Sequence, residues 1–146
     1  MSANGDLSHV EYQALAELRY QLRRFLHFSE QEARVAGLEP QQHQLLLAIK
    51  GLPAGKLASV GELAERLQLQ SHSTVELINR TVERGLLERQ RDPNDQRRVL
   101  IHLTGHGDEL LKRLSLLHRM ELRTSGPALV QMLNALTESQ DGLKEG

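Results

Sequence analysis

The stretch Ser59–Gly107, SVGELAERLQLQSHSTVELINRTVERGLLERQRDPNDQRRVLIHLTGHG, decides the fold of this chain. Ser59-Val60-Gly61-Glu62 and Ser73-Thr74-Val75-Glu76 both match the S-x-x-E capping box, in which serine and glutamate side chains satisfy free backbone amides at a helix start. Two boxes this close leave room for only a short first helix and a brief turn, which is the helix-turn-helix spacing. Such boxes are common, and Ser29-Glu30-Gln31-Glu32 is a third, so they predict helix starts and no particular function.

A charged hairpin follows the second helix, which is expected to end near Gly85. The turn-forming cluster Asp92-Pro93-Asn94-Asp95-Gln96 separates two strand-like runs, Leu86–Arg91 and Arg97–Leu103. Lys56-Leu57-Ala58 is a candidate third strand of the same sheet. Arginines lie on both arms and beside the tip. A helix-turn-helix that carries such a hairpin is a winged helix, and a narrow minor groove of DNA attracts arginines electrostatically.

These residues resemble the MarR family of prokaryotic transcriptional regulators. The wing and the next helix entry carry the resemblance through Asp92-Pro93-x-Asp95-x-Arg97-Arg98 and Leu103-Thr104-x-x-Gly107. Two helix segments add to it, Leu63-Ala64-Glu65-Arg66-Leu67 and Arg80-x-x-Glu83-x-Gly85-Leu86-Leu87. Two positions depart from the family pattern, because Gln68 stands where the turn often has glycine and Gln96 where the wing tip often has another arginine.

The resemblance implies a mainly α fold with a small β-hairpin wing. It implies a single domain of residues 1–146, with a winged helix-turn-helix lobe at 38–103 between dimerisation helices at 8–36 and 104–137. In that family the end helices of two chains interlace, and the two lobes bind a pseudo-palindromic site on double-stranded DNA. The half-sites then lie about one helical turn, roughly 10 bp, apart. The expected function is a dimeric, sequence-specific repressor.

A small aromatic or amphipathic ligand that releases the DNA is also implied by the resemblance. We expect it to act by population shift, because a ligand that fits only a lobe spacing unsuited to DNA lowers the affinity for the operator. The candidate pocket residues are Tyr12, Tyr20, His27, His43 and His118, although packing alone explains them equally well.

The second motif helix and the wing carry the candidate DNA contacts. Val75, Ile78 and Val82 predict a buried stripe, which places Leu77 and Arg80 on the opposite, exposed face. N-terminal residues of a recognition helix meet base edges in the major groove, and an arginine binds either a guanine or a phosphate. The candidate DNA-binding residues are Ser71, His72, Ser73, Thr74, Leu77, Arg80, Arg91, Asp95, Gln96, Arg97 and Arg98.

Helices are expected on both sides of this lobe. Apolar residues recur at helical spacing over Ser8–Phe28, and Ser29–Ala36 either continues that helix or forms a separate turn. The next helix spans Pro40–Lys50 and is apolar nearly all round, which places it in the core.

The C-terminal part of the chain predicts two further helices. Thr104 is a good N-cap for a long helix to about Thr124, and Gly126-Pro127 is expected to interrupt it before a last helix over Pro127–Leu136. The first helix and these two have more apolar surface than one small lobe can bury, which favours a symmetric dimer.

Composition sets the outer bounds. The 146 residues suffice for one domain with a core and are too few for two comfortable ones. A net charge of −1 means that any affinity for nucleic acid must come from local patches. The absence of cysteine excludes disulfides, thiol redox sensing and thiolate metal sites. Without a signal peptide or a long apolar run, the protein is expected to be soluble and cytoplasmic, with no membrane partner.

Other function classes find little support in the sequence. None of the seven histidines belongs to a strong metal-ligand signature, so neither a metal nor a cofactor is expected. G-x-S-x-G, a phosphate loop and a framed pair of carboxylates are all missing, so the chain is not expected to be an enzyme. Two alternatives remain open: a nonspecific architectural DNA binder, and a dimeric protein-interaction module without affinity for DNA.

Overall fold

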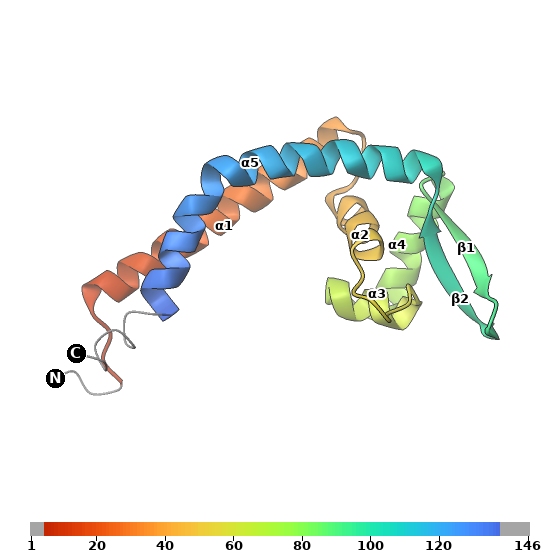
Figure 1. Ribbon diagram of the computed structural model, residues 1–146, viewed down its shortest axis with the longest axis horizontal. Helices are drawn as coiled ribbons and strands as arrows, with labels where there is room; N and C mark the ends of the chain where they lie inside the picture. Colours follow the sequence, from red (N-terminus) through yellow and green to blue (C-terminus); the bar gives the residue numbers. More distant parts are fainter. Residues whose placement is uncertain (1–4, 138–146) are drawn as a thin grey trace. The chain divides into compact units, whose positions relative to one another are not determined.

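The computed structural model describes residues 5–137 of the chain (Figure 1). Within these residues the chain forms five helices and one hairpin of two strands. The elements are α1 (His9–Val35), α2 (Pro40–Lys50), α3 (Val60–Leu67), α4 (Ser71–Glu83), β1 (Leu87–Asp92), β2 (Asp95–Leu103) and α5 (Gly105–Thr137). The predicted fold class, mainly α with a small hairpin wing, is confirmed.

The chain divides into two compact units. The central unit is Glu30–Leu116, and the terminal unit combines Met1–Ser29 with Leu117–Gly146. The central unit holds α2, α3, α4 and the hairpin, together with the last turns of α1 and the first turns of α5. Leu110, Leu111 and Leu114 of α5 belong to its core.

The core of the central unit confirms the position predicted for Pro40–Lys50, which is α2. Leu45 and Leu46 of this helix are fully buried, and each buried leucine stabilises the fold by roughly 1.5–3 kcal/mol. They share one apolar cluster with side chains of α3, α4, both strands and α5. Its large members are Leu38, Leu45, Leu46, Leu63, Leu77, Ile78, Leu86, Leu87, Ile101, Leu110, Leu111 and Leu114.

Helix α1 settles the alternative left open for Ser29–Ala36. The helix continues through this segment and ends at Val35. Gly37 follows at φ +83°, a left-handed conformation that glycine adopts without strain. The amide of Leu38 donates to the carbonyl of Ala33 at 2.9 Å, so the chain leaves the helix through a Schellman turn.

The two helices of the motif begin in different ways. At α3 the Ser59 Oγ accepts a hydrogen bond from the backbone amide of Glu62 at 3.2 Å, which is the serine half of the first predicted capping box. The glutamate half is not formed, because the Ser59 amide donates to the carbonyl of Leu57 at 2.8 Å and the Glu62 carboxylate accepts from Arg66. The second box is wrong, because α4 begins at Ser71 with Gln70 as its N-cap. The amide of Thr74 donates to the carbonyl of Gln70 at 3.0 Å, so Ser73 lies inside the first turn and not at the cap.

The turn between α3 and α4 depends on Gln68. Its backbone is left-handed, with φ 55° and ψ 47°, and it is the sole non-glycine residue with positive φ among those described. A side chain in this conformation costs about 1–2 kcal/mol because its Cβ approaches the backbone carbonyl. Gln68 Nε2 offsets part of this cost by donating to the carbonyl of Glu65 at 2.9 Å.

Replacing Gln68 with glycine is expected to raise the free energy of unfolding by about 1 kcal/mol, because glycine relieves the strain. Gln68→Ala is the control, since it removes the side-chain hydrogen bond and keeps the strained backbone. Urea unfolding of the wild type and both variants measures the difference. If Gln68→Gly were no more stable than Gln68→Ala, the turn would carry no strain.

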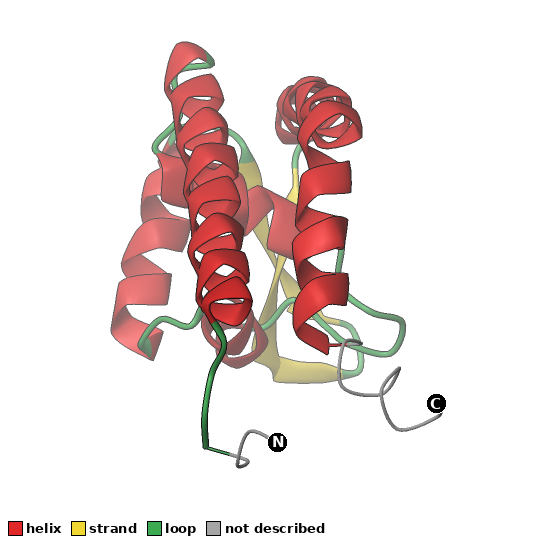
Figure 2. Ribbon diagram, turned by 90° about the vertical axis from the view of Figure 1, so that its left-hand side faces the viewer, coloured by secondary structure: helices red, strands yellow, loops and turns green. Residues whose placement is uncertain are grey.

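The hairpin is longer than the sequence predicts (Figure 2, yellow strands). Leu87 pairs with Leu103 at its base and Asp92 with Asp95 at its tip, so Pro93 and Asn94 alone form the turn. The carboxylate of Asp92 accepts a hydrogen bond from the amide of Asn94 at 2.9 Å, an Asx turn that closes the tip.

The predicted third strand is reduced to a single contact. The amide of Ile101 donates to the carbonyl of Ala58 at 3.0 Å, but Lys56-Leu57-Ala58 is not a strand. Pro53 and Gly55 lie just before it, and such residues weaken extended pairing.

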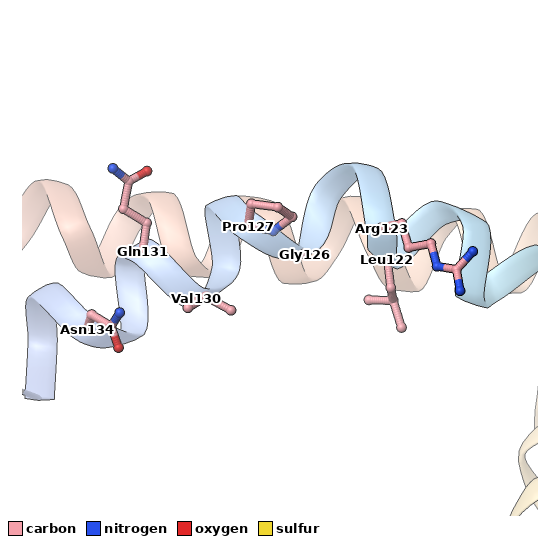
Figure 3. A pocket seen from close by; sticks show the side chains of 7 residues that line it. All are labelled: Leu122, Arg123, Gly126, Pro127, Val130, Gln131 and Asn134. Carbon is pink, nitrogen blue, oxygen red and sulfur yellow. The ribbon is translucent and has the colours of Figure 1, made fainter.

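Helix α5 confirms one prediction and corrects another. The Thr104 Oγ1 accepts a hydrogen bond from the amide of Gly107 at 3.0 Å, which is the expected N-cap. The predicted interruption at Gly126-Pro127 is wrong, because the helix runs on to Thr137 through Pro127 (Figure 3). Because proline has no backbone N–H, Pro127 leaves the carbonyl of Arg123 without its helix hydrogen bond. Both residues are exposed, so water is able to satisfy that carbonyl.

In the terminal unit the first part of α1 and the last part of α5 lie side by side. The His118 Nε2 of α5 and the Ser29 Oγ of α1 are 2.7 Å apart. The His118 ring also meets Phe25 and Phe28 edge-on, with centroids 5.8 and 5.5 Å away. This small cluster joins the two helices where the terminal unit begins.

Candidate nucleic-acid interface

Helix α4 has one buried and one exposed face within the central unit. Thr74, Leu77, Ile78 and Thr81 are at most 1% exposed, and they form the face that meets the core. The exposed residues of α4 are Ser71, His72, Val75, Glu76, Asn79, Arg80 and Glu83. This second face is the part of the helix that a macromolecule is able to touch.

The predicted orientation of α4 is therefore wrong at three positions. Val75, predicted to be buried, is 40% exposed, whereas the predicted DNA contacts Thr74 and Leu77 are 0% and 1% exposed. Thr74 Oγ1 donates to the carbonyl of Gln70 at 3.0 Å, and Thr81 Oγ1 to that of Leu77 at 2.7 Å. Because the helix itself satisfies both hydroxyls, threonine can replace an aliphatic residue in the buried stripe. Thr74 and Leu77 anchor α4 and are not part of the exposed surface.

The other predicted contacts of α4 remain on or beside the exposed face. Ser71 and His72 are exposed at the start of the helix, Ser73 is half-buried, and Arg80 is exposed. They keep their place as candidate contacts, because the start of such a helix meets base edges.

Val75 and Asn79 also belong to the exposed face, although the sequence pattern did not place them there. They lie four residues apart, which places them on one side of the helix, and both are exposed. The sequence does contain a signal for this orientation of α4. Thr74, Leu77, Ile78 and Thr81 recur at helical spacing, and they predict the buried stripe if threonine is counted as a core residue.

Asn79 connects α4 to the wing. Its Oδ1 accepts a hydrogen bond from Arg89 Nη2 of β1. Amide and guanidinium groups are the side chains that bind base edges and phosphates most often. This hydrogen bond therefore joins the exposed face of α4 to the first strand of the wing.

Arg80 is engaged by an acid from another helix. Its Nε and Nη2 donate to the two carboxylate oxygens of Glu39 at 3.1 and 3.2 Å. Glu39 is the N-cap residue of α2, and both side chains remain about half exposed. The predicted DNA contact at Arg80 thus has a partner within the lobe.

At the wing tip, some residues fix the shape of the turn and others present positive charge to the solvent. The Asp95 carboxylate accepts hydrogen bonds from the backbone amide of Arg97 at 3.1 Å and from its Nε at 3.4 Å. Arg91 Nη1 donates to the carbonyl of Gln96 at 2.7 Å, so Asp95 and Gln96 fix the shape of the tip. Arg98 is exposed, and the Arg97 side chain is 94% exposed, so these two present the positive charge.

The five residues predicted for a ligand pocket do not share one cavity. Tyr20 lines an apolar groove of about 650 Å³ in the terminal unit, between α1 and α5, and none of the other four lines it. Tyr12 and His27 are exposed, and His118 belongs to the cluster with Phe25 and Phe28. The fifth, His43, is 4% exposed on α2 of the central unit.

The described part of the chain contains no candidate metal site. Among residues 5–137, no group of three or more histidine, aspartate or glutamate side chains is arranged to hold a metal ion. In the same residues, none of the helices combines the length and the apolar character that a membrane span requires.

Comparison with known proteins agrees with this geometry. The model of the MarR family matches residues 36–98, which hold α2, α3, α4 and most of the hairpin. A Thauera aromatica protein assigned as a transcriptional regulator of the hcr operon is 30% identical over 118 residues, 77% of this chain and 69% of the relative. YkoM of Bacillus subtilis, an uncharacterised helix-turn-helix regulator, is 29% identical over 64% of this chain and 59% of its own length.

Solved structures share the fold of this chain. AbsC of Streptomyces coelicolor, a MarR family transcriptional regulator, superposes with a TM-score of 0.71 at 20% identity, covering 97% of this chain and 99% of its own. A cysteine-to-serine mutant of E. coli MarR in complex with operator DNA gives a TM-score of 0.61 at 19% identity, covering 97% and 94%. With the family model and the Thauera relative, they confirm the resemblance: the chain belongs to the MarR family of winged helix-turn-helix transcriptional regulators.

Proposed function

We propose that this regulator is a dimeric repressor that binds a pseudo-palindromic operator on double-stranded DNA. The observation that carries the proposal is the surface formed by the exposed face of α4 and the wing. It combines groups suited to base edges, at His72 and Asn79, with two exposed arginines at the wing tip. Base contacts supply sequence preference, and arginine contacts with the backbone or the minor groove supply affinity.

Apolar exposure on the terminal unit supports the dimer. Val10 and Tyr12 of α1 are 67% and 59% exposed, and Met120 and Val130 of α5 are 64% and 57% exposed. Large apolar patches on a soluble chain mark an interaction surface, and a second copy covers such a patch by symmetry. The two lobes then read half-sites about 10 bp apart.

The proposed effector is a small aromatic or amphipathic molecule. The groove beside Tyr20 supports it, because apolar side chains of both helices, Val10, Ala14 and Met132 among them, line it. A ligand there releases DNA if it binds better to a lobe spacing that does not match the operator. If no member of a panel of small aromatic acids changes operator release, the effector is excluded from the proposal.

Selection of bound sequences from a random duplex pool tests the proposed function. A palindrome is expected, with two half-sites at one helical turn, and sedimentation is expected to give twice the mass of one chain. Salt titration on the selected and on a random duplex then separates the alternatives, since a repressor keeps its selectivity while both affinities fall. Equal affinity for both duplexes supports an architectural binder, and no binding at low salt supports a protein-interaction module.

Replacing Val75 with serine tests the assignment of the α4 face. The change is expected to alter the preferred base at one position of each half-site by about 1 kcal/mol, because an apolar side chain favours the thymine methyl group. Stability is expected to change by less than about 0.5 kcal/mol, as for other exposed positions. Sequence selection and urea unfolding measure the two quantities. An unchanged preference in the Val75→Ser variant would remove this face of α4 from base contact.

A further inference from the structure

We propose that Glu39 withholds Arg80 from DNA and thereby limits the affinity of each lobe. The inference rests on the proposed function, since it assumes that the exposed face of α4 meets DNA. Arg80 is the candidate DNA-binding arginine of that face, but two of its donors, Nε and Nη2, are engaged by one carboxylate.

The geometry of the pair favours a restraint over a chance contact. Arg80 Nε and Nη2 reach Glu39 Oε2 and Oε1 at 3.1 and 3.2 Å, the bidentate arrangement that adds direction to charge attraction. A phosphate or a guanine edge is able to bind through the same Nε–Nη2 edge of an arginine. Glu39 and a DNA group therefore compete for one binding edge of Arg80.

Glu39 is held in position by the start of α2. Its backbone has the extended conformation of an N-cap residue, with φ −67° and ψ 142°. Its amide donates to Gln42 Oε1 at 3.0 Å, and Gln42 is 2% exposed. Because a buried side chain anchors the backbone of Glu39, the acid stays beside α4 when DNA approaches.

The arginines of the wing provide the contrast. Arg97 is almost fully exposed, and one nitrogen of its guanidinium lies 3.4 Å from Asp95. Arg98 takes part in no ion pair among residues 5–137. The wing therefore presents positive charge, whereas the charge of Arg80 is neutralised on the helix that reads sequence. Attraction to the phosphates depends on the cations that remain unpaired.

Glu39→Gln tests the restraint, because glutamine keeps the size of the side chain and the backbone hydrogen bond. It is expected to tighten binding to both the selected and a random duplex by about five- to tenfold, the range for loss of a well-formed surface ion pair and gain of one DNA contact. The salt dependence is expected to steepen by about 0.9 for each lobe, as for one added phosphate contact. In the Arg80→Gln background, Glu39→Gln is expected to change neither quantity.

Glu83→Gln is the matched control. Glu83 lies on the same helix, three residues from Arg80, and is exposed, so the variant removes the same charge and leaves the pair intact. A gain as large in Glu83→Gln as in Glu39→Gln would overturn the inference in favour of general charge. Weaker binding by Glu39→Gln to the selected duplex alone would also overturn it, since Glu39 would then position Arg80 for base contact.

Arg97→Ala separates failure of this inference from failure of the proposed function. If Arg97→Ala weakens DNA binding while Glu39→Gln leaves it unchanged, only the restraint on Arg80 is overturned. If neither the wild type nor any variant binds duplex DNA at low salt, the proposed function fails and the inference fails with it.

Discussion

Replacing Gly107 with alanine is expected to destabilise the protein by about 3 kcal/mol, the upper range for a side chain forced into a packed core. A Cβ atom at this position lies 2.2 Å from the carbonyl oxygen of Leu86 and 3.1 Å from its carbonyl carbon. Both are backbone atoms, so no change of rotamer relieves the clash. The first turn of α5 must move away from the hairpin, and part of the core opens.

The junction has little freedom to move. The Leu86 carbonyl accepts a hydrogen bond from the Thr104 amide at 3.1 Å, and Thr104 Oγ1 donates to the carbonyl of Gly85 at 2.7 Å. The Leu86 side chain is 1% exposed, and Leu110 lies one turn after Gly107 in the same core. A shift that accommodates the methyl group therefore breaks backbone contacts or leaves a cavity.

Gly105→Ala is the control for the loss at Gly107. Gly105 is the first residue of α5, and a Cβ atom there meets nothing within 4 Å. This variant is expected to be neutral or more stable by up to about 1 kcal/mol, because alanine favours the helix. Urea unfolding of the wild type and both variants measures the effect. Equal stability of Gly107→Ala and Gly105→Ala would show that the junction adapts, contrary to this expectation.

The local elements of this fold were predictable because short-range chemistry determines them. Ser59 and Thr104 cap the helices that follow them, Pro40 begins α2, and Gly37 ends the turn after α1. The hairpin follows from a cluster of turn formers between two strand-like runs. In each case the deciding interaction joins residues within a few positions of one another.

The orientation of α4 was not predictable by hydrophobicity alone. Val75 and Leu77 are both apolar, and the choice between them depends on which side of the helix packs against the core cluster. Threonine decides it, because Thr74 and Thr81 bury their hydroxyls by bonding to the helix itself. A pattern that counts threonine as polar places the exposed face on the wrong side, and the predicted contact at Leu77 followed from that error.

The pair between Arg80 and Glu39 also lies beyond local sequence rules. The two residues are 41 positions apart, and only the packing of α2 against α4 brings them together. Pro127 shows the converse, because a local sequence signal predicted a helix end where α5 in fact continues. Both cases require knowledge of which surface is buried and which is open to water.

Replacing both Arg97 and Arg98 with alanine is expected to weaken binding to any duplex by on the order of 100-fold for each lobe. Each lost hydrogen bond between a guanidinium and a DNA acceptor removes roughly 1.5 kcal/mol, or about a factor of ten. The loss is expected at every sequence, because contacts to phosphates and to the width of the minor groove carry little base information. Fluorescence anisotropy across a range of salt concentrations, on the selected and a random duplex, measures it.

The salt dependence identifies the origin of this loss. Two arginines on each wing are expected to lower the slope of log K against log salt by about 1.8 for each lobe if both meet phosphates. Arg34→Ala is the control, since Arg34 is an exposed arginine of α1 that pairs with Glu30. Weaker binding with an unchanged slope would indicate that the variant distorts the hairpin. Unchanged binding and an unchanged slope would show that the wing is not part of the interface. The single variant Arg98→Ala distinguishes loss of charge from a change in the shape of the tip. It leaves intact the contacts of Asp95 with Arg97 and of the Gln96 carbonyl with Arg91, which hold the tip. It is expected to lower the slope by about half as much as the double variant.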